Sequence, residues 1–229
     1  MKAIAIALAL LDFAPVFFLA LGLFFLAQLV DRLEPRCRVM ALAGFGLVTL
    51  GGLARALSNL MLAFTGQEIP LLATSLYVFA GPGFLLMAAS MVRARAALAK
   101  RRVARDPWIV PSVVSWLFLG AAYYLNTSVE PGGEGNRILI ALALFGSAVI
   151  CLVGAALGWA RQLHMAAFLF GMHLVGTGIF VGLRYLETQN LLIQLFGELL
   201  SLAAQAGFAF AAWRVAAEYQ AKVGPTAAR

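Results

Sequence analysis

The chain is poor in charged residues. Only 12% of its 229 residues are Asp, Glu, Lys or Arg, and 63% are hydrophobic, whereas soluble domains carry about 25% charged residues. A soluble fold cannot hide that much apolar surface, so the sequence predicts an integral membrane protein, with residues 1–229 forming a single membrane domain in the lipid bilayer. The net charge of +7 lies mostly beside apolar runs, so we expect no nucleic-acid partner.

Cysteine and histidine are also scarce, with two residues of each. Cys37 falls in a predicted loop and Cys151 in a predicted span, which excludes a disulfide framework and any metal-ligand spacing. His164 and His173 lie on opposite faces of one predicted helix, so they cannot share a metal or a haem. No nucleophile elbow, phosphate loop or Cys-x-x-Cys motif is present. We therefore expect no metal, no cofactor and no catalytic residue, and an enzyme is the less favoured class.

Long apolar runs make up most of the chain. Seven of them are long enough to cross about 30 Å of hydrocarbon as α-helices, and they lack the alternation of a β-barrel strand. The sequence thus predicts an all-α bundle of seven transmembrane helices with a short cytoplasmic tail at 215–229. A bend is expected at Gly81-Pro82-Gly83 in the third helix. The predicted spans are 3–30, 39–64, 71–92, 109–125, 138–158, 165–185 and 191–214.

The loops alternate in basic content. Six Lys and Arg residues lie between Arg93 and Arg105 (RARAALAKRRVAR), and the loop at 31–38 is basic too, whereas 65–70 has none and 126–137 has only Arg137. Cytoplasmic loops retain basic residues, so we predict that the N-terminus faces out and the C-terminus faces in. We expect Arg93–Arg105 to contact anionic lipid headgroups. The compact loops and the Ala, Leu and Gly content favour a bacterial inner membrane. Three tryptophans fall at the predicted cytoplasmic helix ends: Trp108, Trp159 and Trp213.

The basic loop after the third span divides the helices as three, one and three, which is compatible with two parallel repeats. In helix number and orientation this layout is similar to the SWEET and PQ-loop sugar transporters and to the microbial rhodopsins. The Pro-Gln pair of the PQ-loop proteins is absent, and the seventh span has no lysine for a retinal Schiff base. The likeness therefore implies an arrangement of helices and no function.

Four ionisable residues fall well inside the predicted spans: Asp12, Arg55, His173 and Glu198. A charge near the bilayer centre costs at least about 2.5–3.5 kcal/mol, so these side chains should face the bundle interior. Counting from the span midpoints puts Asp12, Arg55 and Glu198 about 5–7 Å to the outer side of the midplane. We predict that the guanidinium of Arg55 is bracketed by the two carboxylates. Their formal sum of −1 leaves room for a proton or another cation.

Further polar residues extend this cluster. Asn59 is one turn from Arg55 on the same helix face, and Tyr77 lies in the outer half of the third span, where it would line a cavity or join the interfacial tyrosines. His173 is either a hydrogen-bonded interior residue or a proton relay. The candidate substrate- or ion-binding residues are Asp12, Arg55, Glu198, Asn59, Tyr77 and His173.

Three explanations of these charged residues remain open: a salt bridge that locks three helices together, a substrate or proton site, and separate side chains that snorkel towards the lipid surface. The leading hypothesis is a small-molecule or ion-coupled membrane transporter in which Arg55 holds an anionic group and Asp12 or Glu198 exchanges a proton or cation. The alternative is a non-transporting sensor, assembly factor or subunit of a larger complex, with a membrane-protein partner or a second copy of the chain. The third hypothesis is an intramembrane lipid-modifying enzyme.

Overall fold

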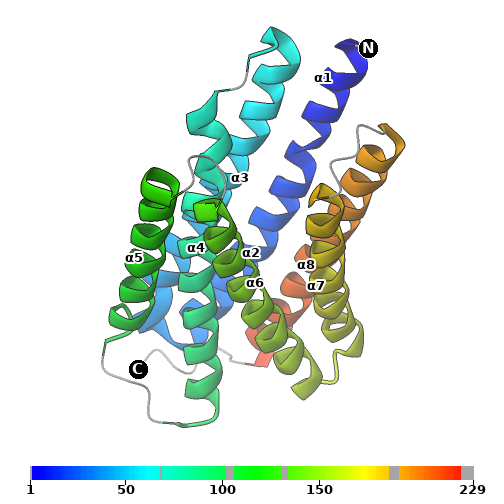
Figure 1. Ribbon diagram of the computed structural model, residues 1–229. Coiled ribbons are helices and arrows are strands. Elements are labelled where there is room, and N and C mark those ends of the chain that lie inside the picture. Colours follow the sequence, from blue (N-terminus) through cyan, green and yellow to red (C-terminus); the bar gives the residue numbers. More distant parts are fainter. Residues whose placement is uncertain (1, 68, 102–105, 130–133, 186–190, 223–229) are drawn as a thin grey trace.

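In the computed structural model, the chain folds into a bundle of long α-helices (Figure 1). The structure describes residues 2–67, 69–101, 106–129, 134–185 and 191–222, and no strand is present within these ranges. The described residues contain seven helical spans that are long and apolar enough to cross a membrane. The predicted all-α architecture with seven helices of membrane-spanning length and hydropathy is therefore confirmed for the described residues, and it is typical of a multi-pass membrane protein.

The first span consists of two helices, α1 (Lys2–Leu11) and α2 (Phe13–Leu33). A short 3-10 turn, η1 (Pro35–Cys37), leads into the second span, and a π-helical turn, η2 (Leu125–Val129), follows the fourth. The other six spans are α3 (Arg38–Thr65), α4 (Pro70–Leu98), α5 (Ile109–Tyr124), α6 (Glu134–Ala160), α7 (His164–Tyr185) and α8 (Leu191–Lys222).

The interruption of the first span at Asp12 differs from the single helix predicted over 3–30. Pro15 has no N–H to donate to the carbonyl of Leu11, and its ring crowds that carbonyl. Asp12 still donates its own N–H to the carbonyl of Leu8 at 3.1 Å, with φ −56° and ψ −25°. The two helices therefore run on as one span that is interrupted at the acidic residue.

Two helices run past their predicted ends. Helix α4 continues from the predicted residue 92 to Leu98, and α8 continues from 214 to Lys222, so the first part of the predicted tail at 215–229 is helical. The hydropathy pattern stops at the first arginines, Arg93 and Arg214, but the Ala-rich segments that follow have high helix propensity and can project from the membrane into water. Residues 223–229 and residues 102–105 of the basic loop lie outside the described ranges.

Six spans form a closed ring. Helix α2 packs against α3, α3 against α4, α4 against α6, α6 against α7, α7 against α8, and α8 back against α2. Helix α5 lies outside this ring against α4 and α6 (Figure 1). The side chain of Trp116, in the middle of α5, is 75% exposed, as expected for a face in contact with lipid.

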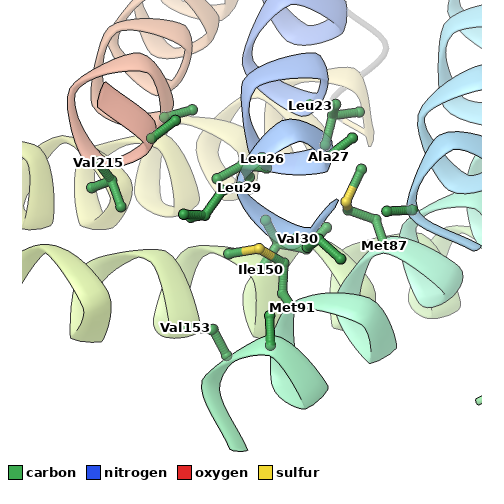
Figure 2. Close-up of a cluster of buried hydrophobic side chains, with 14 of the residues drawn as sticks. Leu23, Leu26, Ala27, Leu29, Val30, Met87, Met91, Ile150, Val153 and Val215 are labelled. Carbon is green, nitrogen blue, oxygen red and sulfur yellow. The ribbon is translucent and has the colours of Figure 1, made fainter. Parts of the chain in front are cut away.

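The apolar core fills the end of the ring opposite the N-terminus. It is built from the C-terminal halves of α2, α4, α6 and α8 and the N-terminal halves of α3 and α7. Figure 2 shows Leu26 and Val30 of α2 meeting Met91 of α4 and Ile150 of α6 at its centre. All four side chains are at most 1% exposed, so this end of the ring is closed.

Glycines allow α3, α4 and α6 to approach closely. A Cβ atom on Gly44 would lie 2.7 Å from the carbonyl oxygen of Gly83, and a Cβ on Gly83 would lie 3.0 Å from the carbonyl oxygen of Gly44. On the other side of α4, a Cβ on Gly81 would lie 3.3 Å from the carbonyl oxygen of Leu139. Pro82 lies between these two glycines inside α4, which continues to Leu98. The bend predicted there stays a prediction, whereas both flanking glycines lie at helix contacts.

Candidate functional site

A cavity of about 670 Å³ lies at the end of the ring that holds the N-terminus. Its wall comes from α1, α3, α7 and α8, and most of the wall is apolar. Four polar side chains interrupt that wall: Asp12, Asn59, Gln194 and Glu198. The volume falls in the range of about 300–1,000 Å³ that is typical of small-molecule sites, and an apolar wall with a few convergent polar groups is their usual composition.

The cavity exists because the first span changes partners along its length. Helix α2 packs closely against α8, whereas α1 packs mainly against α3. Figure 1 shows α1 standing apart from the start of α8, and the cavity lies between these two helices, with α3 and α7 completing the wall. Asp12 lies at the boundary between α1 and α2, so its side chain is placed at the floor of the opening.

A hydrogen bond fixes the carboxylate of Asp12. Asn59 donates from Nδ2 to Oδ2 of Asp12 at 2.5 Å, in a partly buried position. A hydrogen bond to an ionised acceptor is short and stronger than one between neutral groups. The sequence predicts only that Asn59 shares the helix face of Arg55 and indicates no partner for it. The structure shows that it connects α3 to the break in the first span.

Arg55 lies one turn before Asn59 on α3. It is therefore farther than Asn59 from the end of the bundle that holds the N-terminus of the chain, and its side chain is half-buried. It is not among the described residues that line the cavity. Asp12, Asn59 and Glu198 are therefore the three predicted site residues that the cavity brings together. Arg55 is one turn along α3 from Asn59, the residue that holds Asp12.

A row of polar residues continues the site along α8. Gln194, Glu198, Ser201 and Gln205 follow one another at intervals of four, three and four residues, which puts them on one helix face over about 16 Å. Oε1 of Gln205 is buried without a hydrogen-bond partner among the described atoms, and so is Oγ1 of Thr177 on the adjacent α7. An unsatisfied buried polar atom costs about 1–3 kcal/mol, so these two oxygens mark positions suited to water.

His173 lies at the end of this row that is nearer to the apolar core. Its side chain is 2% exposed, its Nδ1 is 3.3 Å from the carbonyl oxygen of Ala204, and its ring centroid is 4.6 Å from that of Phe208. A carbonyl oxygen only accepts, so this hydrogen bond requires the proton on Nδ1. A Cβ on Gly22 would lie 2.5 Å from the Phe208 ring, so Phe208 packs directly on the α2 backbone. His173 and Phe208 thus separate the polar row from the apolar core.

Tyr77 is half-buried on α4, a helix that contributes no described residue to the cavity wall. The structure therefore brings neither Tyr77 nor His173 to the cavity. The site also includes Gln194, a residue that the sequence signals by its spacing of one turn from Glu198.

Among the described residues, no three His, Cys, Asp or Glu side chains gather as metal ligands. Cys37 and Cys151 are both buried free thiols. The described polar groups of the cavity wall are two carboxyl and two amide side chains. No protein-family model, curated protein or solved structure matches the chain.

Proposed function

We propose that the protein is a small-molecule or ion-coupled membrane transporter whose binding site is the cavity between α1, α3, α7 and α8. One observation carries this proposal: a cavity with two carboxyl groups in a largely apolar wall lies at one end of the ring, and a closed apolar core fills the other end. A transporter exposes its site to one side of the membrane at a time. A site that is open at one end and sealed by Phe208 and the core at the other has this geometry.

The chemistry of the site supports ion coupling. Asp12 and Glu198 are groups that exchange protons or cations, and intramembrane carboxyl groups commonly mark such pathways. Interrupted helices often form ion sites in transporters, because the break releases backbone carbonyls from the helical pattern. Pro15 deprives the carbonyl of Leu11 of its usual donor next to the carboxylate of Asp12. The row from Glu198 to Gln205, with its unsatisfied oxygen, continues from the cavity into the bundle.

The arrangement in the membrane is part of the proposal. The ring can be divided into two three-helix units, one that ends in α4 and one that begins with α6. Helix α5, outside the ring, would then connect the two units. The basic residues around η1 and at the end of α4 lie at the closed end, so retention of basic residues in the cytoplasm puts the N-terminus and the cavity outside and the C-terminus inside. A bacterial inner membrane remains the proposed location.

Flux into proteoliposomes tests the proposal. We expect the wild-type protein to carry at least one of three radiolabelled probe classes, an organic cation, a sugar or a carboxylic acid, in a manner that depends on a pH gradient. Asp12→Asn and Glu198→Gln should abolish that flux. Asp31→Asn is the matched control, because Asp31 lies at the closed end in a solvent-exposed ion pair with Arg38 and should leave flux unchanged. Flux that survives both cavity substitutions would refute this site.

The second candidate is a non-transporting subunit, sensor or assembly factor. The Asn59–Asp12 hydrogen bond favours it, because a link between α3 and the first span is also what a purely structural lock would provide. Such a subunit would show no flux for any probe class and would co-purify with one fixed membrane protein. The lipid-modifying enzyme gains no support from the position of His173, which is packed against Ala204 and Phe208 below the cavity.

A further inference from the structure

We infer that the cavity takes an amphiphile, a molecule with a hydrogen-bonding head and an apolar chain, directly from the bilayer through the gap between α1 and α8. The head lies in the cavity beside Asp12 and Asn59, and the chain lies in a second hollow that adjoins the cavity at this gap. This inference rests on the proposed function, because it names the class of substrate that the cavity takes and the route by which the substrate enters.

The gap between α1 and α8 carries the first step. Among the described residues, α1 packs against α2 and α3, whereas α8 packs against α2, α6 and α7. Figure 1 shows α1 standing apart from the start of α8. Since no extensive packing joins these two helices within the described residues, side chains rather than backbones separate the cavity from the outside of the ring at this position.

A second hollow lies at the same pair of helices. It measures about 430 Å³, and its described lining residues are all apolar, including Ile4 and Leu11 of α1 and Leu195 of α8. Ile4 is 50% exposed and Leu195 is 38% exposed, so the hollow is open to the surroundings of the bundle. Both residues belong to segments that are long and apolar enough to span a membrane, so in a bilayer these surroundings are lipid.

The hollow and the cavity meet at Leu8 of α1, which lines both of them. Ile4 and Leu11, each one turn from Leu8, line the hollow and not the cavity. Asp12, one turn from Leu8 in the other direction around the helix, lines the cavity and not the hollow. The two spaces therefore lie on adjacent stripes of one helix, with a leucine at their border.

Helix α8 forms the other side of this border. Gln194 lines the cavity, and the next residue, Leu195, lines the hollow. The passage between the two spaces thus runs between Leu8 and consecutive residues of α8. Leu8 is half-buried, and a leucine side chain can change between staggered rotamers, so the passage can open without moving a helix.

The composition of the cavity wall determines the chemistry of the head. Asp12, Asn59 and Gln194 present carboxyl and amide groups, which accept hydrogen bonds whether or not the carboxyl is protonated. A purely apolar ligand would leave these groups without partners, which is unfavourable in a buried site. A purely polar solute would leave the apolar surface of Leu62, Ile193 and the second hollow uncovered. A hydroxyl-rich head on an apolar chain matches both surfaces, and its recognition by hydrogen bonds does not depend on the net charge of the cavity.

A photoreactive dodecyl glucoside tests the inference, because it joins a hydroxyl-rich head to an apolar chain. Two versions are used, one with a diazirine on the glucose ring and one with a diazirine at the end of the chain. Each is irradiated with the unmodified protein in lipid nanodiscs, and the labelled peptides are identified by mass spectrometry. We expect the head probe to label residues 59–63 of α3, which contribute to the wall of the cavity and not to the hollow. The chain probe should label residues 4–11 of α1 or Leu195 of α8.

Competition shows whether the chain is required. An excess of unlabelled dodecyl glucoside should suppress the labelling of residues 59–63, whereas an excess of glucose should not. Labelling of α1 and α8 without labelling of residues 59–63 would mean that the probe rests on the surface of the bundle, and it would overturn the inference. Suppression by glucose as strong as that by dodecyl glucoside would overturn it as well.

Two exposed alanines provide a matched pair of variants. Ala7 lines the hollow and not the cavity, and Ala121 lies on α5, outside the ring. Ala7→Trp should fill the hollow and lower the labelling of residues 59–63 by the head probe about fivefold or more, because the added ring competes for the space of the chain. Ala121→Trp should be labelled as the unmodified protein is. Equal labelling of the two variants would contradict entry through the hollow.

The outcomes separate this inference from the proposed function. Labelling at both places, without transfer of the glucoside between the two leaflets of proteoliposomes, would keep the ligand class and refute the transporter. Flux of a water-soluble probe that requires Asp12, without labelling of residues 59–63 by the head probe, would keep the transporter and refute the ligand class.

Discussion

At the scale of single residues, Pro15 has the largest consequence for the site. It removes one helical hydrogen bond from the first span, and the interruption falls at Asp12, where the span parts from α8. The carboxylate is thereby placed at the floor of a cavity and within reach of Asn59. One imino acid three positions along the chain therefore accounts for a helical hydrogen bond that is missing beside Asp12.

The hydrogen bond between Asn59 and Asp12 can be measured by a double-mutant cycle. Asp12→Ala, Asn59→Ala and the double variant are unfolded with SDS in mixed micelles. The hydrogen bond is partly buried and its acceptor can be ionised, so we expect the two losses of unfolding free energy to be non-additive by about 0.5–3 kcal/mol. The double variant should be less destabilised than the sum of the single variants. Losses that add to within about 0.5 kcal/mol would show that the pair contributes nothing as a pair.

The sequence predicted Asp12, Asn59 and Glu198 as members of one site, but it did not predict the hydrogen bond between Asn59 and Asp12. Depth along the spans put Asp12 and Glu198 at one level, and the cavity contains both. Arg55 and Asn59 share a face of α3 and differ by one turn, about 5.4 Å. The relative height of two packed helices decides whether Arg55 or Asn59 reaches a given side chain on the neighbouring helix. Span boundaries that are read from hydropathy are uncertain by a similar distance. A single sequence therefore indicates the face and leaves the partner open.

At the scale of elements, close helix contacts hold the wall of the ring in place. Helix α4 lies between α3 and α6, and its backbone approaches both of them through glycines. In a membrane, where no hydrophobic force drives apolar helices together, such close van der Waals packing is a main source of association. The crossing of α3 and α4 at Gly44 and Gly83 should therefore tolerate little added volume.

Two glycines of α3 provide a matched test of this crossing. A Cβ on Gly44 would meet the backbone of α4, whereas a Cβ on Gly46 has nothing within 4 Å. Gly44→Ala should lower the free energy of unfolding by about 1–3 kcal/mol through overpacking. Gly46→Ala should be neutral or stabilising by up to about 1 kcal/mol, because alanine favours a helix over glycine. Thermal unfolding in detergent checks both, and an equal loss of stability would contradict the packing argument.

Helix number was predictable because backbone satisfaction in lipid leaves few alternatives to an α-helix for each long apolar run. Helix ends were not, and α4 and α8 show why. Hydropathy reports the length of chain in hydrocarbon, while the helix continues for as long as its residues favour it, through Arg93 and Arg95 in α4 and through Arg214 in α8. The position of α5 outside the ring was also beyond a single sequence, because the hydropathy of α5 equals that of α8, a helix within the ring.

At the scale of the whole molecule, the two ends of the bundle differ. Large side chains such as Met87, Met91 and Phe208 fill the end opposite the N-terminus, and most of the described basic residues lie at that end, in helix ends and the turns between them. The polar cavity occupies the other end. Orientation in the membrane therefore decides which compartment has access to the cavity.

Reporter fusions determine that orientation. Green fluorescent protein, which folds when left in the cytoplasm, should fluoresce when fused after Arg229 or after Lys100 in the basic segment. Alkaline phosphatase needs disulfides and hence an oxidising compartment, so it should be active only when fused after Gly66, in a loop without basic residues. Replacing Arg93, Arg95, Lys100 and Arg101 by Ala should weaken this pattern, since Lys and Arg in short loops set the orientation. The reverse pattern in the unmodified chain would place the cavity on the cytoplasmic side, and Asp12 and Glu198 would then meet their ligand from within the cell.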